Sequence, residues 1–389
     1  MSRVLVPIFL ICLFACTDQS EPPPAAADES GDITLEDGAS GVELELDLGG
    51  VDREAHTALS GGATTVFRED EEAFETVAPN LSGDHLAQHE EGDEGFELAH
   101  VRGNGVNGGL GPVFDNTSCE SCHLGDGRGR PPELEGGQFT SMLFRSSVSG
   151  EDASGGPAGI PTGFGGQLQM QALSPALPDI RALIRYVDSK GSFADGTPYV
   201  LHVPQYTLTG MYPGLPANIL FSPRVAPVVF GLGLLEAVPD QAIMSNSDER
   251  DSDRDGISGR ANLVYDAVRK QRVVGRFGWK ANTPNLLQQA AGAYNGDMGV
   301  TSDLFPVESC AGRIKDPACN NLHAPEVDAE TVANVAFYTQ TLAVPARRNL
   351  DDAQLAGARL SSTLSVAMDA TPPPCAPASY RASPKSPTR

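Results

Sequence analysis

The run Cys119-Glu120-Ser121-Cys122-His123 constrains this chain more than any other stretch of its 389 residues. It has the form C-x-x-C-H, the pattern through which c-type haem is attached covalently to a protein. Each thiol at this spacing can form a thioether bond to a haem vinyl group, and the adjacent imidazole then lies under the iron as its proximal ligand. The motif predicts one haem c, held by Cys119 and Cys122 and ligated by His123.

Two other uses of a Cys-x-x-Cys pair fit this sequence less well. A zinc site needs two further Cys or His ligands at a matching spacing, and none is evident. A thioredoxin-type redox pair lies between a strand and a helix of a βαβ unit, which the Gly-rich surroundings of this motif do not suggest.

The first 16 residues are expected to be a targeting segment. Arg3 supplies a short positive region, residues 4–14 are apolar but too few to span a bilayer, and polar residues follow Cys16 at once. This boundary is typical of a bacterial lipoprotein signal that is cleaved before Cys16, whose sulfur then carries lipid. Because Phe14 is not the usual small residue, plain secretory cleavage is the alternative. Either route predicts an exported protein, in the periplasm or lipid-anchored at the outer-membrane surface.

Charge and the remaining cysteines agree with export. The formal net charge of −24 argues against nucleic acid as a partner and suits a protein that meets cationic electron-transfer partners. Cys310 and Cys319 are nine residues apart in a polar stretch of an exported chain, so a disulfide between them is expected. Cys12 lies within the signal, and Cys375 is left over.

Hydrophobic spacing predicts mostly short elements. Helices are expected over residues 67–74, 86–96, 219–238 and 288–294, and from Asp328, which can cap its own helix, to about Leu342. Residues 180–187 and 197–206 alternate in the manner of a β-hairpin. Residues 17–55, rich in Pro, Ala, Gly and acids, are expected to be a disordered linker, although 42–48 alternates like an edge strand.

The sequence also contains a candidate calcium-binding loop and candidate sixth ligands for the haem iron. Residues 251–260 match the first half of a Ca²⁺-binding loop, but the twelfth position is Asn262 rather than a bidentate Glu. Another acid such as Asp248 would have to complete the site, and an acidic solvated turn is the alternative. The expected calcium ligands are Asp251, Asp253, Asp255 and the carbonyl of Ile257. A Met thioether is a standard sixth ligand of haem iron, and the candidates are Met298 and Met142, with Met170, Met211 and the histidines also open.

Further motifs surround these sites. They are LGPVF (110–114), DGRGRPP (126–132), GGQLQ (165–169), FADGTPY (193–199), GLGLLEA (231–237), DGISGR (255–260), GRFGWK (275–280), GDMG (296–299) and LAVPARR (342–348). With the haem motif they resemble the bacterial di-haem oxidoreductase family of peroxidase-like proteins, sometimes called thiol oxidoreductases, over residues from about Leu59 to Leu355.

The resemblance implies a mainly α fold with two cytochrome c-like lobes, long loops and a small β-hairpin insertion. Residues 56–164 would form the haem c lobe, and 165–355 the inter-haem region and the start of the second lobe. An electron-donor protein or small redox carrier would supply electrons, which would pass to peroxide or a related oxidant. Glu236 and Gln167 are the candidate catalytic polar groups, and Trp279 and a Ca²⁺ would lie between the haems.

One departure from the family pattern is large. A second C-x-x-C-H is expected shortly after Asp352, but residues 361–375 lack it and no His follows Cys375. The tail, residues 356–389, is therefore expected to be disordered or to be the product of a frameshift. The frameshift is possible because a shifted reading of the codons for residues 366–372 can encode Cys-x-Gly-Cys-His-Thr. The alternatives to a peroxidase-like enzyme are a mono-haem electron-transfer cytochrome c and an inactive truncated product.

Overall fold

A computed structural model of the chain describes residues 59–348, with the exception of 134, 153–155, 161–162, 213, 253, 255, 257, 314–316 and 321–324. The predicted signal, linker and tail lie outside the described residues, as do Cys16 and three of the four predicted calcium ligands, Asp253, Asp255 and Ile257. No helix within the described part of the chain is both long and apolar enough to cross a bilayer.

The prediction of a mainly α fold is wrong: the structure is 22% helix and 24% strand, with several small sheets. Residues 67–74 form bends rather than a helix, since four successive acids at 69–72 repel one another there. Residues 219–238 contain Pro223 and Pro227, which cannot donate helical hydrogen bonds, and they divide into a strand and one short helix.

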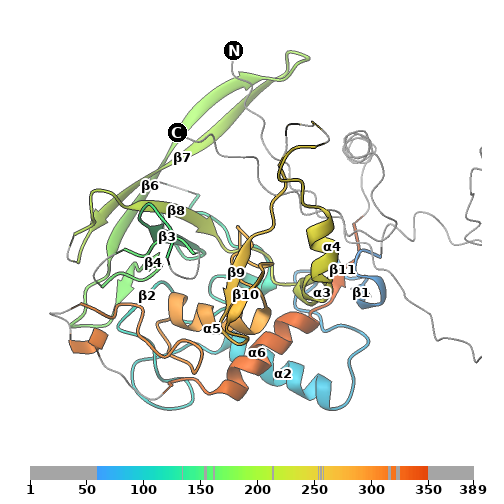
Figure 1. The fold of residues 1–389 in the computed structure, drawn as a ribbon, viewed down its shortest axis with the longest axis horizontal. Coiled ribbons are helices and arrows are strands. Elements are labelled where there is room, and N and C mark those ends of the chain that lie inside the picture. Colours follow the sequence, from blue (N-terminus) through green and yellow to red (C-terminus); the bar gives the residue numbers. More distant parts are fainter. Residues whose placement is uncertain are drawn as a thin grey trace, which may run out of the picture.

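Three longer helices form the main core: α2 (Asp84–Glu97), α5 (Leu286–Asp297) and α6 (Ala329–Thr341) (Figure 1). The short helices are α3 (Leu232–Ala237) and α4 (Asp240–Ser245), and the 3-10 turns are η1 (Gly62–Thr64), η2 (Leu124–Asp126) and η3 (Pro317–Asn320). Helix α6 packs on α2, α5 and α3 and is the centre of this part of the fold.

Helix α6 begins where the sequence predicted. The Asp328 carboxylate accepts a hydrogen bond from the Thr331 backbone N–H at 2.7 Å, which satisfies one of the free donors of the first turn. The predicted apolar face, Val332, Val335, Ala336 and Thr339, is buried as expected.

The strands form one three-stranded and four two-stranded sheets among the described residues. The three-stranded sheet has the order β4-β3-β8, and the other pairs are β6-β7, β9-β10, β2-β5 and the parallel pair β1-β11, which joins Thr65 to Val344. The strands are β1 (Thr65–Val66), β2 (Val113–Phe114), β3 (Met142–Ser147), β4 (Gln167–Leu168), β5 (Gln171–Ala172), β6 (Ile180–Ser192), β7 (Pro198–Gly210), β8 (Leu220–Val225), β9 (Leu263–Asp266), β10 (Gln271–Val274) and β11 (Val344–Pro345).

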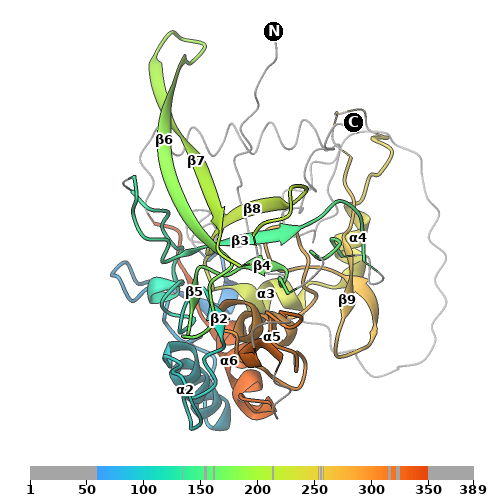
Figure 2. The ribbon, with the colours of Figure 1, turned by 90° about the vertical axis from the view of Figure 1, so that its left-hand side faces the viewer.

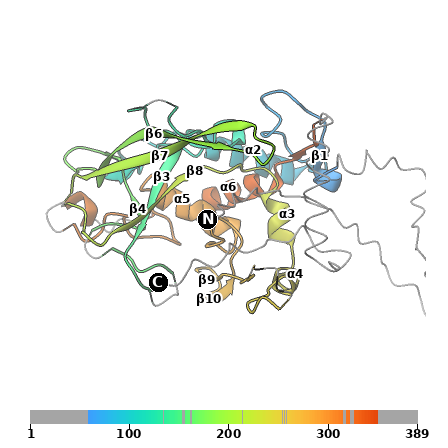
Figure 3. The ribbon, with the colours of Figure 1, turned by 90° about the horizontal axis from the view of Figure 1, so that it is seen from above.

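The predicted β-hairpin is present as β6 and β7, which pair over 13 residues each. One end of this ribbon packs on the β4-β3-β8 sheet through Ile180, Tyr206 and Leu208, and the other end projects away from the rest of the molecule (Figure 2). Viewed from above, the β-rich part lies over helices α5 and α6 (Figure 3). The structure also joins Cys310 and Cys319 by a disulfide, with Cα atoms 5.2 Å apart.

Candidate haem site

The haem motif forms a tight hydrogen-bonded turn shortly after β2. The backbone N–H groups of Cys122 and His123 both donate to the Cys119 carbonyl at 3.0 Å. Ser118 and Ser121 exchange backbone-to-side-chain hydrogen bonds of 3.3 and 3.1 Å, so Ser118 caps the turn as a helix N-cap would. The turn is too short to count as a helix.

His123 is held in the protonation state that an iron ligand requires. Its Nδ1 lies 2.8 Å from the Pro227 carbonyl oxygen, and because a carbonyl only accepts, Nδ1 carries the proton. The other nitrogen, Nε2, therefore keeps its lone pair. Burial lowers the pKa of His123, which further favours the neutral ring. A backbone carbonyl on the non-ligating nitrogen is the usual way to orient a metal-binding His.

The two cysteines are free thiols. Burial raises the pKa of Cys119, and burial with the nearby Asp297 charge raises that of Cys122 to about 12. Both are thus neutral at neutral pH, whereas thiol–disulfide exchange requires a thiolate. This donor set of two unpaired thiols and one oriented imidazole fits haem c better than a redox disulfide.

The apolar surroundings of the motif come from the helical core. Cys119 packs against a buried cluster that includes Phe96, Phe114, Tyr338 and Met298. The Phe96 ring lies 6.2 Å from the His123 ring between centroids. The structure thus places the candidate ligand Met298 in the same cluster as a haem cysteine.

Met142, the other named candidate, is buried on strand β3. The Thr140 carbonyl, two residues before this strand begins, accepts a 3.3 Å hydrogen bond from the Cys122 thiol, so the segment leading into the strand borders the motif.

Gln167, a predicted catalytic group, links two buried acids. Its amide nitrogen donates to Asp115 Oδ2 at 2.7 Å and to Asp297 Oδ1 at 2.8 Å. Burial raises the pKa of both carboxyl groups, and the charges of both raise the pKa of Cys122. Gln167 therefore stabilises a polar network beside the haem motif.

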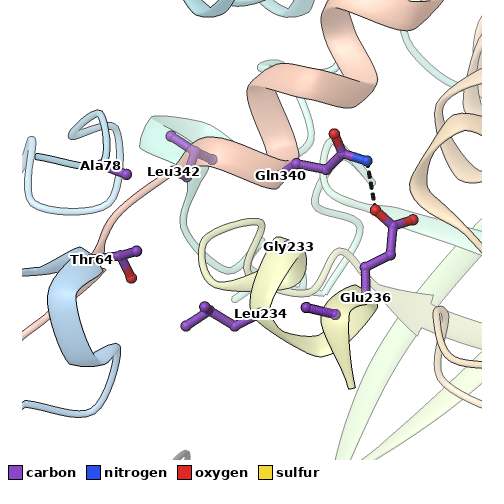
Figure 4. A pocket seen from close by; sticks show the side chains of 8 residues that line it. Thr64, Ala78, Gly233, Leu234, Glu236, Gln340 and Leu342 are labelled. Atoms are coloured by element: carbon purple, nitrogen blue, oxygen red, sulfur yellow. Dashed lines mark hydrogen bonds between the residues drawn. The ribbon is translucent and has the colours of Figure 1, made fainter. Parts of the chain in front are cut away.

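Glu236, the other predicted catalytic group, lies on α3 beside a cavity of about 330 Å³ (Figure 4). Its Oε1 accepts from the Leu286 backbone N–H at 2.7 Å, at the first turn of α5, and its Oε2 accepts from the Gln340 amide at 2.5 Å. Both oxygens are thus engaged in holding helices together. No residue of the haem motif lines this cavity.

Trp279, predicted to lie on an electron path, is close to the segments that flank the haem motif. Its indole N–H donates to the Val225 carbonyl at 3.0 Å, and the Arg128 guanidinium lies 5.8 Å from its ring centroid. Arg128 follows the motif by five residues and Val225 precedes Pro227 by two. The indole is 44% exposed.

The predicted calcium loop is described only in part. Within the described residues, no three His, Cys, Asp or Glu side chains gather where they could hold a metal ion. Asp251 accepts a hydrogen bond from the Gly256 backbone N–H, and Asp248 accepts two from Ser252. The calcium site therefore stays a prediction.

Two partners of the site were not identified from the sequence. Pro227 contributes through its carbonyl, a group that every residue carries, so nothing in its identity marks it. Asp126 lies in the DGRGRPP motif, but its partner Tyr338, which donates to Asp126 Oδ2, is 212 residues away. In the sequence, Tyr338 stood out only as a polar residue on an otherwise apolar face of its helix.

Comparison with known protein families gives a match over two segments of the chain. A family model described as "Di-haem oxidoreductase, putative peroxidase" matches residues 54–145 and 214–380, which together are more than half of the chain. The unmatched residues between these segments include β6 and β7. Neither a curated protein nor a solved structure matches the chain.

Proposed function

From the premise that the chain belongs to the di-haem oxidoreductase, putative peroxidase family, we propose that it is a c-type haem oxidoreductase. In this proposal it passes electrons from a donor protein or small redox carrier to peroxide or a related oxidant. One haem c is attached at Cys119 and Cys122, with His123 as the proximal ligand. A bound haem supplies an iron centre that exchanges single electrons and reacts with peroxide.

The contact between His123 Nδ1 and the Pro227 carbonyl carries this proposal. An imidazole with its proton fixed on Nδ1 offers Nε2 to the iron without a competing proton. The hydrogen bond also fixes the plane of the ring and makes the ligand more basic. Met298 or Met142 would occupy the sixth position, and Trp279 and a Ca²⁺ would serve electron transfer.

Export belongs to the same proposal. In bacteria c-type haem is attached outside the inner membrane, which the predicted signal and lipid site at Cys16 would allow. A chain of net charge −24 favours an electron donor with a basic surface.

Covalent haem content tests the attachment. The full chain, produced in a host that matures c-type cytochromes, is expected to retain haem on a denaturing gel and to give a haem c spectrum in alkaline pyridine. The Cys119→Ala/Cys122→Ala variant should lose both signals. The Cys310→Ser/Cys319→Ser variant is the matched control, because it removes two cysteines that lie outside the motif. Wild-type protein without covalent haem would refute the proposal.

The hydrogen bonds of Glu236 favour a second candidate function, that of a mono-haem electron-transfer cytochrome c. Both of its oxygens accept hydrogen bonds from structural partners, so it is not a free acid–base group. Electron transfer needs no such group. Cyanide binding to the ferric protein together with peroxide turnover would favour the enzyme. A six-coordinate low-spin haem without turnover would favour the cytochrome.

A further inference from the structure

The β6-β7 ribbon is long enough that one of its ends extends beyond the rest of the protein. Its 13 paired residues span about 43 Å at about 3.3 Å per residue. The end formed by Ile180 and Gly210 contacts the body, and the end formed by Ser192 and Pro198 projects from it (Figure 2). An isolated two-stranded hairpin is only marginally stable in water, so a projecting ribbon of this length calls for a partner.

The two faces of the ribbon differ. Side chains alternate along each strand, so even-numbered β6 residues share one face and odd-numbered residues share the other. The even face packs on the body through Ile180 and Ile184, which are 0% and 3% exposed, and through Ala182, Tyr206 and Leu208. Further out, this face carries an Asp188–His202 contact and Lys190.

The odd face, which we call the outer face, is open and carries several exposed apolar side chains. Val187 lies directly opposite Val203, and they are 38% and 42% exposed. Leu183 and Leu201 extend the same stripe, at 45% and 49% exposed. At the turn Phe193 contacts the Tyr199 ring at 4.9 Å and is 60% exposed. Contiguous exposed apolar residues of this kind mark interaction sites.

The charges at the two ends of the ribbon are complementary when one copy is reversed against another. Arg181 and Arg185 lie toward the base, and neither forms an ion pair within the part of the chain that the structure describes. Asp195 lies at the exposed turn, between Phe193 and Tyr199 in the sequence, and its carboxylate accepts a 2.9 Å hydrogen bond from the Thr197 backbone N–H. One end therefore carries guanidinium groups, and the other end carries a carboxylate and aromatic rings that bind guanidinium.

We propose that two copies of the chain pair through their outer faces, antiparallel about a twofold axis. Each copy then sets its Arg181 against the turn of the other, and the apolar stripes meet between the two ends. A twofold contact of this kind uses the same patch on both copies and closes on itself. The net charge of the ribbon also favours such a contact. Residues 180–210 carry three Lys or Arg and two Asp, a net charge of +1, whereas the whole chain carries −24. Copies that repel elsewhere can meet here.

The size of the face sets the expected affinity. A ribbon about 43 Å long and roughly 10 Å wide presents on the order of 400 Å² in projection on each copy. Protruding side chains increase this area, which places the contact at about 1,000 Å² in total, the lower end of specific interfaces. We expect a dimer with a dissociation constant in the micromolar range.

Sedimentation equilibrium of the full chain tests the pairing with two adjacent residues of β7. Leu201 lies on the outer face and Val200 on the opposite face, and they are 49% and 46% exposed. Leu201→Glu should weaken the dimer at least about tenfold, while Val200→Glu, the matched control, should change it by less than about threefold. Thermal unfolding monitored by circular dichroism will show that both variants remain folded.

Charge reversal tests the orientation. Arg181→Glu should weaken the dimer, and Arg181→Glu combined with Asp195→Arg should restore it, because the two sites meet only in the antiparallel pairing. A monomeric wild type at about 100 μM, equal effects of Leu201→Glu and Val200→Glu, or the absence of restoration would overturn the proposal. A wild type that stays monomeric but binds vesicles containing anionic phospholipid would assign the outer face to a membrane instead.

Discussion

The Tyr338 hydroxyl donates a 2.5 Å hydrogen bond to Asp126 Oδ2 and so ties helix α6 to the loop that follows the haem motif. Both residues are almost fully buried, and Asp126 Oδ1 has no hydrogen-bond partner among the described residues. Burial raises the pKa of Asp126 to about 8, and the Tyr338 hydrogen bond only partly offsets this. Asp126 is therefore mostly a neutral acid at neutral pH.

This pairing predicts an unusual pH dependence of stability. The folded-state pKa of Asp126 lies above its unfolded value of about 3.9, so the folded protein binds one more proton between pH 4 and 8. Its contribution is complete below about pH 4 and falls by up to roughly 1.4 kcal/mol per pH unit as pH rises toward 8. Asp126→Asn, which cannot ionise, should remove that slope.

Urea unfolding of wild type and Asp126→Asn between pH 5 and 9 measures the difference. Glu308, whose pKa burial also raises to about 8, contributes equally to both proteins and cancels. Parallel stability curves for the two proteins would contradict a buried, proton-binding Asp126.

Gly92 sets the distance between α2 and α6. A Cβ at this position would lie 2.1 Å from the Asn334 carbonyl oxygen, a backbone atom that cannot move away cheaply. Gly92→Ala should therefore force the helices apart and cost about 2–4 kcal/mol, despite the better helix propensity of Ala.

Gly292 provides the matched control on α5. The nearest atom to a Cβ there is 3.8 Å away on Phe305, so Gly292→Ala should be neutral or stabilise by up to about 1 kcal/mol. Chemical denaturation measures both variants, and equal effects would show that the α2–α6 contact is not tight.

Local patterns in the sequence predict helices and strands but not the segments that they pack against or pair with. Asp328 and the apolar residues after it are enough to predict α6, and alternation over 180–206 is enough to predict the ribbon. The end of the ribbon at Gly210 and the strand β8 depend on pairing with distant residues, which no local pattern encodes. The mainly α expectation was wrong for this reason: several short strands form only through contacts with other segments.

The same limit applies to the site. Cys119, Cys122 and His123 are adjacent in sequence, so their chemistry is visible there. The Pro227 carbonyl and the Tyr338 hydroxyl reach the site only through the fold. Gln167 and Glu236 were candidates through the family resemblance, and the structure shows what each contacts, which the residue type alone does not specify.

Gln167 should contribute far more to stability than its neighbour Gln169. Gln167→Met removes the donor shared by two buried acids and should cost about 2–4 kcal/mol. Gln169 is equally buried, but its amide makes a single side-chain bond, to the Gly296 carbonyl, and its Oε1 has no partner among the described residues. Gln169→Met should cost less than about 1 kcal/mol. Urea unfolding at one pH compares the two, and similar losses would refute the bridging role of Gln167.

Glu236 is expected to position helices rather than to transfer protons. A carboxylate at the first turn of α5 satisfies the Leu286 N–H and interacts favourably with the helix dipole, for about 1–2 kcal/mol together. Glu236→Ala should lose this amount in thermal or urea unfolding. Glu236→Gln keeps an oxygen for Leu286, and the Gln340 amide can rotate to accept from the new NH₂ group, so its loss should be below about 1 kcal/mol.

Peroxide turnover separates the two roles of Glu236. If it only positions helices, Glu236→Gln should retain turnover within about threefold at unchanged haem content. An acid–base group contributes about 10²–10⁴-fold, and Gln cannot replace it. A fall of that size in Glu236→Gln at unchanged stability would identify Glu236 as a catalytic acid or base. Its hydrogen bonds to Leu286 and Gln340 would then have to give way during the reaction.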